Sequence, residues 1–166
     1  MAIKKEGLVN KVNFGLIIII LFAIIGCSKS FDERVANRIE ESCSSKVTSK
    51  CLVDINELTD FDWDSLYVFG GLMTVAELNQ ALGFECNCDH LPDNYYRLVF
   101  TKGKSIVYES QYYGLDGKVQ FRSVEMNTEI KFSKNQSKFF VTKKSNTLTT
   151  GFFYDLYPVD RSIDEK

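Results

Sequence analysis

Apolar residues recur every three or four positions in two stretches of this chain, which is the spacing of an amphipathic helix. The first stretch runs from about residue 31 to 43, behind a Ser30/Glu33 pair with capping-box spacing. The second runs from about 75 to 82, behind a Thr74/Glu77 pair of the same kind. Both stretches therefore predict short helices with defined starts.

Elsewhere apolar and polar residues alternate with a period of two, which predicts strands. Polar or glycine-containing turns separate these segments, and Asp116-Gly117 has the composition of a hairpin turn. The predicted strands span residues 51–55, 65–69, 95–101, 106–113, 119–123, 130–133, 139–143 and 148–156. We expect an α+β fold, in which one antiparallel meander sheet of about five to seven strands is covered on one face by one or two short helices.

The first 26 residues have a different character from the rest. Lys4, Lys5 and Lys11 precede an apolar block over residues 14–26, which is shorter than the roughly 20 residues that a membrane span needs. A charged start, a short apolar run and a small residue at its end are typical of a secretory signal, and an uncleaved anchor helix is the alternative. The predicted division is a signal at 1–26, a tether at 27–30, one α+β domain at 31–158 and a charged, frayed tail at 159–166.

The end of this signal, Ile24-Ile25-Gly26-Cys27, resembles the lipobox of bacterial lipoproteins. The resemblance implies cleavage before Cys27 and acylation of its thiol and new amino group, and several acyl chains anchor a protein stably. Ser28 stands where the enteric sorting rule wants Asp for inner-membrane retention, which implies the periplasmic face of the outer membrane. Because the predicted helix begins almost at once, the domain should lie close to the membrane.

Two further stretches resemble other envelope proteins. Residues 57–70, with the sequence ELTDFDWDSLYVFG, are similar to small uncharacterised bacterial envelope proteins, although Gly71-Leu72 replaces their usual Pro-Tyr. That resemblance implies no known activity. Residues 73–83 are more weakly similar to small outer-membrane assembly lipoproteins, which carry a Met-Thr-capped helix ending in Leu-Gly before a β-meander.

The charge balance argues against a nucleic-acid surface. Removal of residues 1–26, which hold three lysines and one glutamate, would change the formal net charge from −2 to −4. A mildly acidic domain does not have the basic surface that nucleic acid requires. The expected partners are the membrane, through Cys27, and a protein of the envelope.

Four cysteines follow Cys27, and an even number in an exported chain predicts two disulfides. A Cys86–Cys88 bridge would close a very tight ring. We therefore prefer Cys43 and Cys51 each bonded to one of Cys86 and Cys88. The pairing of Cys43 with Cys51 and of Cys86 with Cys88 remains open.

Two clusters carry metal-binding residue types at unfavourable spacing. Cys86-x-Cys88-x-His90 could supply three zinc ligands, but cysteines of an exported chain pair more readily as disulfides. Asp60-x-Asp62-x-Asp64 resembles the start of an EF-hand loop, but Ser65 and Gly71 stand where that loop needs Gly and Glu. We expect no metal and no cofactor.

The chain lacks the short motifs of known catalytic sites, and His90 is its only histidine. We therefore expect a non-enzymatic protein that binds another envelope protein, as an assembly factor or as an inhibitor or immunity-like protein. A small hydrolase acting on glycan or peptide, using His90 or the aspartates of residues 60–64, is the first alternative. A ligand-binding module with an aromatic pocket is the second.

The expected binding face comprises Asp60, Asp62, Trp63 and Asp64, whose acidity suits a basic partner. The same alternation also fits an amphipathic segment. In that interpretation Phe61 and Trp63 face the core and the aspartates face water.

Overall fold

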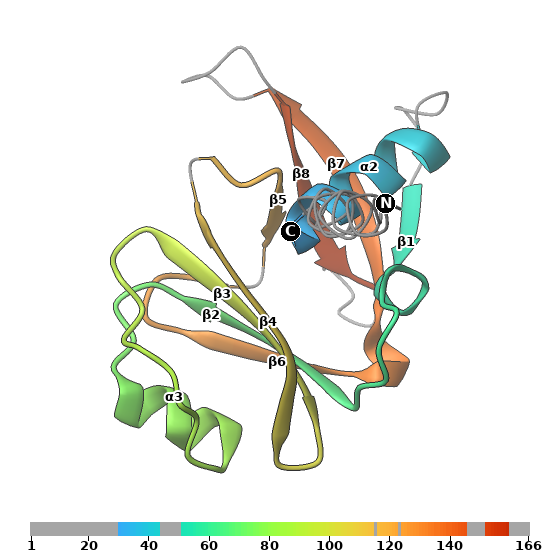
Figure 1. The fold of residues 1–166 in the computed structure, drawn as a ribbon. Coiled ribbons are helices and arrows are strands. Elements are labelled where there is room, and N and C mark those ends of the chain that lie inside the picture. Colours follow the sequence, from blue (N-terminus) through green and yellow to red (C-terminus); the bar gives the residue numbers. More distant parts are fainter. Residues whose placement is uncertain (1–29, 44–50, 115, 123, 146–151, 160–166) are drawn as a thin grey trace, which may run out of the picture.

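The computed structural model describes residues 30–43, 51–114, 116–122, 124–145 and 152–159, which form an α+β domain (Figure 1). Its helices are α2 (Phe31–Cys43) and α3 (Val75–Leu82), and its short 3-10 helices are η1 (Ile55–Leu58) and η2 (Lys134–Gln136). Its strands are β1 (Cys51–Asp54), β2 (Ser65–Gly70), β3 (Tyr95–Lys102), β4 (Ser105–Tyr113), β5 (Val119–Phe121), β6 (Glu129–Ser133), β7 (Lys138–Ser145) and β8 (Phe152–Pro158).

The two predicted helices are confirmed at their predicted bounds. Thr74 and Glu77 form the capping box of α3, with the Glu77 carboxylate accepting from the Thr74 backbone N–H at 2.7 Å. Gly83 ends α3 in the left-handed conformation, which glycine adopts without steric cost. At α2 the Glu33 carboxylate accepts from the Ser30 backbone N–H at 3.2 Å, while the Ser30 hydroxyl donates to Asp32 at 2.6 Å. Local sequence signals therefore place both helices.

The prediction of a single meander sheet is wrong. The strands form two sheets of four, with the order β1-β7-β8-β5 in sheet A and β4-β3-β2-β6 in sheet B. Neighbouring strands are antiparallel except for β5 and β8, which are parallel. The chain passes between the sheets at one corner, through η1 from β1 to β2 and through η2 from β6 to β7. Period-two alternation fixes the faces of a strand but not its neighbours, so the sequence did not reveal this split.

The predicted hairpin at Asp116-Gly117 is also wrong, because β4 and β5 belong to different sheets. The turn does form, with the Gly117 backbone N–H donating to the Tyr113 carbonyl at 2.9 Å. A Cβ on Gly117 would lie 2.6 Å from a carbon of the Tyr112 ring. The glycine is therefore needed for close approach to this ring.

Sheet B separates two hydrophobic cores. Along β2, Leu66 and Val68 enter the main core, whereas Tyr67 and Phe69 enter the smaller one. The main core lies between sheet B, α2 and one face of sheet A, and the smaller core lies between sheet B, α3 and the loop that follows α3. Figure 1 shows α2 and α3 on opposite sides of the domain.

The disulfides join Cys43 to Cys51 and Cys86 to Cys88, with Cα–Cα distances of 5.8 and 5.2 Å. The preferred pairing between the two groups is therefore wrong, and the pairing that had been left open is the one that forms. Cys43 and Cys51 pack in the main core, and Cys86 and Cys88 pack against the smaller one. Sheet B lies between the two groups, so a bond across it is excluded.

The predicted signal, Cys27 and residues 148–151 and 160–166 lie outside the described residues. Within the described ranges, neither helix is long and apolar enough to cross a membrane.

Candidate functional site

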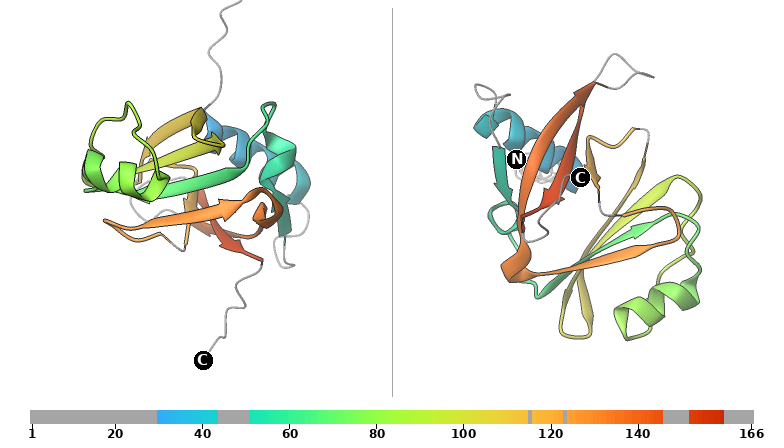
Figure 2. Two further views of the ribbon diagram at one scale, coloured as in Figure 1. Left: turned by 90° about the horizontal axis from the view of Figure 1, so that it is seen from below. Right: turned by 180° about the vertical axis from the view of Figure 1, so that it is seen from behind.

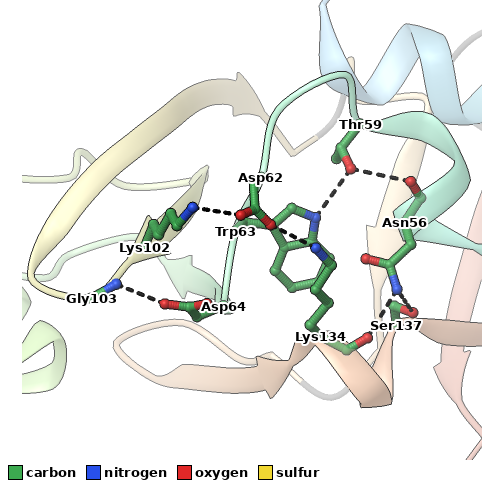
Figure 3. Close-up of polar contacts among 9 residues, drawn as sticks. All are labelled: Asn56, Thr59, Asp62, Trp63, Asp64, Lys102, Gly103, Lys134 and Ser137. Carbon is green, nitrogen blue, oxygen red and sulfur yellow. Dashed lines mark hydrogen bonds and ion pairs between the residues drawn. The ribbon is translucent and has the colours of Figure 1, made fainter.

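The acidic segment 60–64 connects η1 to β2 beside the corner between the sheets. Phe61 packs against the main core and Trp63 is fully buried in it, whereas the aspartates are exposed. The Trp63 Nε1–H donates to the Thr59 hydroxyl oxygen at 3.1 Å (Figure 3). Trp63 therefore stabilises the core and is not part of a binding surface, as the amphipathic interpretation of this segment expected.

Asp62 lies between two lysines that come from different parts of the chain. Its carboxylate oxygens are 2.5 Å from Lys102 Nζ, at the end of β3, and 2.8 Å from Lys134 Nζ, in η2 (Figure 3). Hydrogen bonds from Lys102 and then Lys134 hold the pKa of Asp62 well below its ordinary value. The same contact with Asp62 raises the pKa of Lys102. The carboxylate is therefore ionised and neutralised within the domain.

The other two aspartates also have partners inside the domain. Asp64 accepts a hydrogen bond from the Gly103 backbone N–H at 2.8 Å and so holds the β3–β4 turn (Figure 3). Asp60 lies 3.8 Å from the Arg34 guanidinium and is 87% exposed. The segment therefore does not offer a strongly negative surface to a basic partner.

The corner itself is held by Asn56 of η1. Its amide Nδ2 donates to the Lys134 carbonyl at 3.0 Å and to the Ser137 hydroxyl at 2.8 Å (Figure 3). The Ile55 backbone N–H donates to the Ser137 carbonyl at 2.9 Å. These contacts join η1 to η2, and they set the angle at which the two sheets meet.

The cysteine–histidine cluster is not assembled as a metal site. Cys86 and Cys88 are bonded to each other, so they do not offer thiolates, and His90 lies on an exposed loop. Among the described residues, no three His, Cys, Asp or Glu side chains gather into a possible metal site.

Sheet A has a face that the sequence analysis missed. We call it the outer face of sheet A, because it lies opposite the face that packs on α2 and the main core. Seen from behind, β7 and β8 lie in front of α2 (Figure 2, right). Leu52, Phe140 and Tyr157 are cross-strand neighbours on the outer face, and Phe153 lies further along β8. None of these four residues belongs to either core, and Leu52 is 48% exposed.

Among the described residues, the exposed charged side chains of this face are all positive: Lys138, Lys144 and Arg122. Asp155 is fully buried beside the 43%-exposed Arg122 side chain, whose Nε lies 2.8 Å from the Asp155 carboxylate. The hydrogen bond to Asp155 raises the pKa of Arg122. Asp54, the other acid of this face, is half-buried and accepts a hydrogen bond from Ser137. The outer face therefore combines apolar side chains with a basic rim.

A signal for this face is present in the sequence. Phe139-Phe140 and Phe152-Phe153 are consecutive aromatic residues within strands. Since successive side chains of a strand point to opposite faces, one ring of each pair must lie away from the main core.

Comparison with known proteins gives no indication of function. No protein family, no curated protein and no solved structure matches the chain.

Proposed function

We propose that this chain is a lipid-anchored protein of the bacterial cell envelope that binds another protein through the outer face of sheet A. The observation that carries the proposal is the apolar ladder of Leu52, Phe140 and Tyr157, which lies outside both cores. Leu52 is 48% exposed, and Phe140 and Tyr157 are half-buried beside it. Apolar side chains that stay accessible within a polar rim are typical of protein interaction sites.

The charges of the outer face favour an acidic partner. Lys138 and Lys144 are exposed and make no ion pair with a described residue, whereas the charge of Arg122 is compensated by the buried Asp155 carboxylate at 2.8 Å. Complementary charges steer association and select partners. This replaces the basic partner expected from the acidic segment, because Lys102, Lys134 and Arg34 compensate that segment internally.

The anchor in this proposal is Cys27, and it would hold the domain near the bilayer. Three residues lie between Cys27 and Phe31, the first residue of α2, so the four Cα–Cα steps that join them span at most about 14 Å. Since α2 lies on the inner side of sheet A, the outer face is directed away from the helix that follows the anchor. A partner can then reach it without displacing α2.

The properties of Asp62 favour binding over the hydrolase alternative. An acid catalyst needs a carboxyl whose pKa is raised towards neutrality. The pKa of Asp62 moves in the opposite direction, because two lysines stabilise its charged form. Its contacts stabilise the fold and do not prepare it to donate a proton.

The anchor is tested by metabolic labelling with palmitate. The wild-type protein should incorporate the label and fractionate with membranes, and Cys27→Ala should not be labelled because the acylated thiol is gone. Absence of label from the wild-type protein would contradict the anchor.

The binding surface is tested by two matched leucine substitutions. Leu52 and Leu72 are both exposed, at 48% and 57%, but only Leu52 lies on the outer face. When the tagged protein is isolated from solubilised membranes, Leu52→Glu should weaken capture of the partner by about tenfold or more. Leu72→Glu should leave capture unchanged, and equal loss in both variants would place the interface elsewhere.

A further inference from the structure

A groove of about 440 Å³ lies between α2 and the start of β8, on the side of sheet A opposite the outer face. Its volume is in the range of small-molecule sites. The α2 residues of the groove are three or four positions apart, so one face of the helix forms one wall. The groove is lined by Glu33, Ala36, Asn37, Glu40, Lys118, Phe152 and Tyr154.

The helix wall is acidic and the facing wall is aromatic. Glu33 and Glu40 are two helical turns apart, or about 10 Å along the axis. The Tyr154 hydroxyl donates to the Glu40 carboxylate at 3.1 Å. Burial and, to a smaller extent, this hydrogen bond raise the pKa of Tyr154 to about 12, so its hydroxyl stays protonated and remains a donor. Phe152 is 53% exposed and offers its ring to the groove.

Two ammonium groups complete the surroundings of the groove. Lys118 lies near the first turn of α2, where its backbone N–H donates to Asp32 at 3.3 Å, and its side chain makes no ion pair with a described residue. Lys143 Nζ lies 4.3 Å from the centre of the Phe152 ring and 5.8 Å from that of Tyr154. The groove thus offers carboxylate acceptors to a cationic group and the Lys118 ammonium to an anionic group. It also offers the Phe152 ring to apolar atoms.

We propose that this groove binds a zwitterionic lipid headgroup that carries a primary ammonium and a phosphate, as phosphatidylethanolamine does. The ammonium donates hydrogen bonds to the Glu40 carboxylate, and the phosphate pairs with Lys118. Glu33, about 10 Å away along the helix, keeps its hydrogen bond from the Ser30 backbone N–H at 3.2 Å. Phe152 contacts the glycerol and the adjoining acyl carbons. A ligand with a single charge of either sign would leave either the Glu40 carboxylate or the Lys118 ammonium without a partner in the groove.

The position of the groove suits a ligand from the bilayer, and this step rests on the proposed anchor at Cys27. Glu33 lies in the first turn of α2, whose first residue is within about 14 Å of Cys27. Headgroups of neighbouring lipids are therefore within reach.

The test is calorimetric titration of the purified full-length lipoprotein in non-ionic detergent with glycerophosphoethanolamine, the soluble form of the headgroup. Ethanolamine alone and glycerol phosphate alone should each bind about tenfold more weakly or worse, because each retains one of the two charges. Phosphatidylethanolamine in mixed micelles should compete, whereas phosphatidylcholine, which has no ammonium N–H donor, should not.

Substitutions at exposed positions identify the groups involved. Glu40→Gln and Lys118→Glu should each weaken glycerophosphoethanolamine binding about tenfold, and Lys104→Glu, in the β3–β4 turn, should not. The proposal is overturned if no binding occurs up to about 10 mM, if either half binds as tightly as the whole, or if Lys104→Glu has the same effect. Palmitate labelling and the Leu52 substitution do not depend on the groove, so failure here is distinguishable from failure of the proposed function.

Discussion

Asp62 is the residue at which three separate parts of the chain meet. It belongs to the segment before β2, and its partners are Lys102 at the end of β3 and Lys134 in η2. Its side chain is 60% exposed, so its role is to fix positions and not to fill the core. Sequence alternation predicted that this carboxylate faces water, but not that two lysines would surround it.

Substitution of Asp62 should produce a pH-dependent loss of stability. The folded pKa lies below the ordinary value of 3.8, so the stabilisation is present above about pH 4 and disappears as pH falls through the folded pKa. In urea denaturation, Asp62→Asn should lower the unfolding midpoint at pH 7, and its difference from wild type should shrink below pH 4.

Asp60→Asn is the matched control for this experiment. Asp60 lies 3.8 Å from its nearest cation and is 87% exposed, so its substitution should change the midpoint less at every pH. If the two variants behave alike, the ion pairs of Asp62 do not stabilise the fold.

At the scale of elements, the corner formed by η1 and η2 determines how the two sheets meet. Asn56 donates to both the Lys134 carbonyl and the Ser137 hydroxyl, and a carboxylate of the same size cannot make either contact as a donor. Asn56→Asp should therefore lower the free energy of unfolding by about 1–3 kcal/mol in denaturant titration. Asn87→Asp, at an exposed loop position, should change it by about 0.5 kcal/mol or less. Similar losses in both variants would mean that the corner contacts are dispensable.

The elements also show where sequence reasoning succeeds. The bounds of α2 and α3 follow from local signals, because a capping box and an apolar stripe are carried by nearby residues. The strands are found for the same reason, with small shifts at their ends. The pairing of β5 with β8 depends on residues more than 30 positions apart and leaves no local signal.

At the scale of the whole molecule, the position of sheet B explains the errors in the predicted site. Cys86 and Cys88 lie on one side of sheet B, and Cys43 and Cys51 lie on the other. Composition shows that the domain has four cysteines, but not on which side of sheet B each of them lies. The lysine partners of the acidic segment come from β3 and η2, which are distant in sequence. No local pattern reveals them, so the segment was predicted as a negatively charged binding face.

The outer face of sheet A and the groove beside α2 lie on opposite sides of one sheet. A lipid-anchored domain arranged in this way could contact a headgroup through α2 while presenting the outer face to a protein. The two surfaces share no residue, so substitutions in one should leave the other unaffected.

The most direct test of the proposed function is in-cell photo-crosslinking from position 52, with position 72 as the control. A crosslinker at position 52 should capture one protein with an acidic surface, and the product should be lost in Lys138→Glu/Lys144→Glu but retained in Lys104→Glu, because only the first two lysines lie on the outer face. Crosslinks of equal strength from both positions, or a position-52 product that is insensitive to reversal of Lys138 and Lys144, would contradict the proposed function.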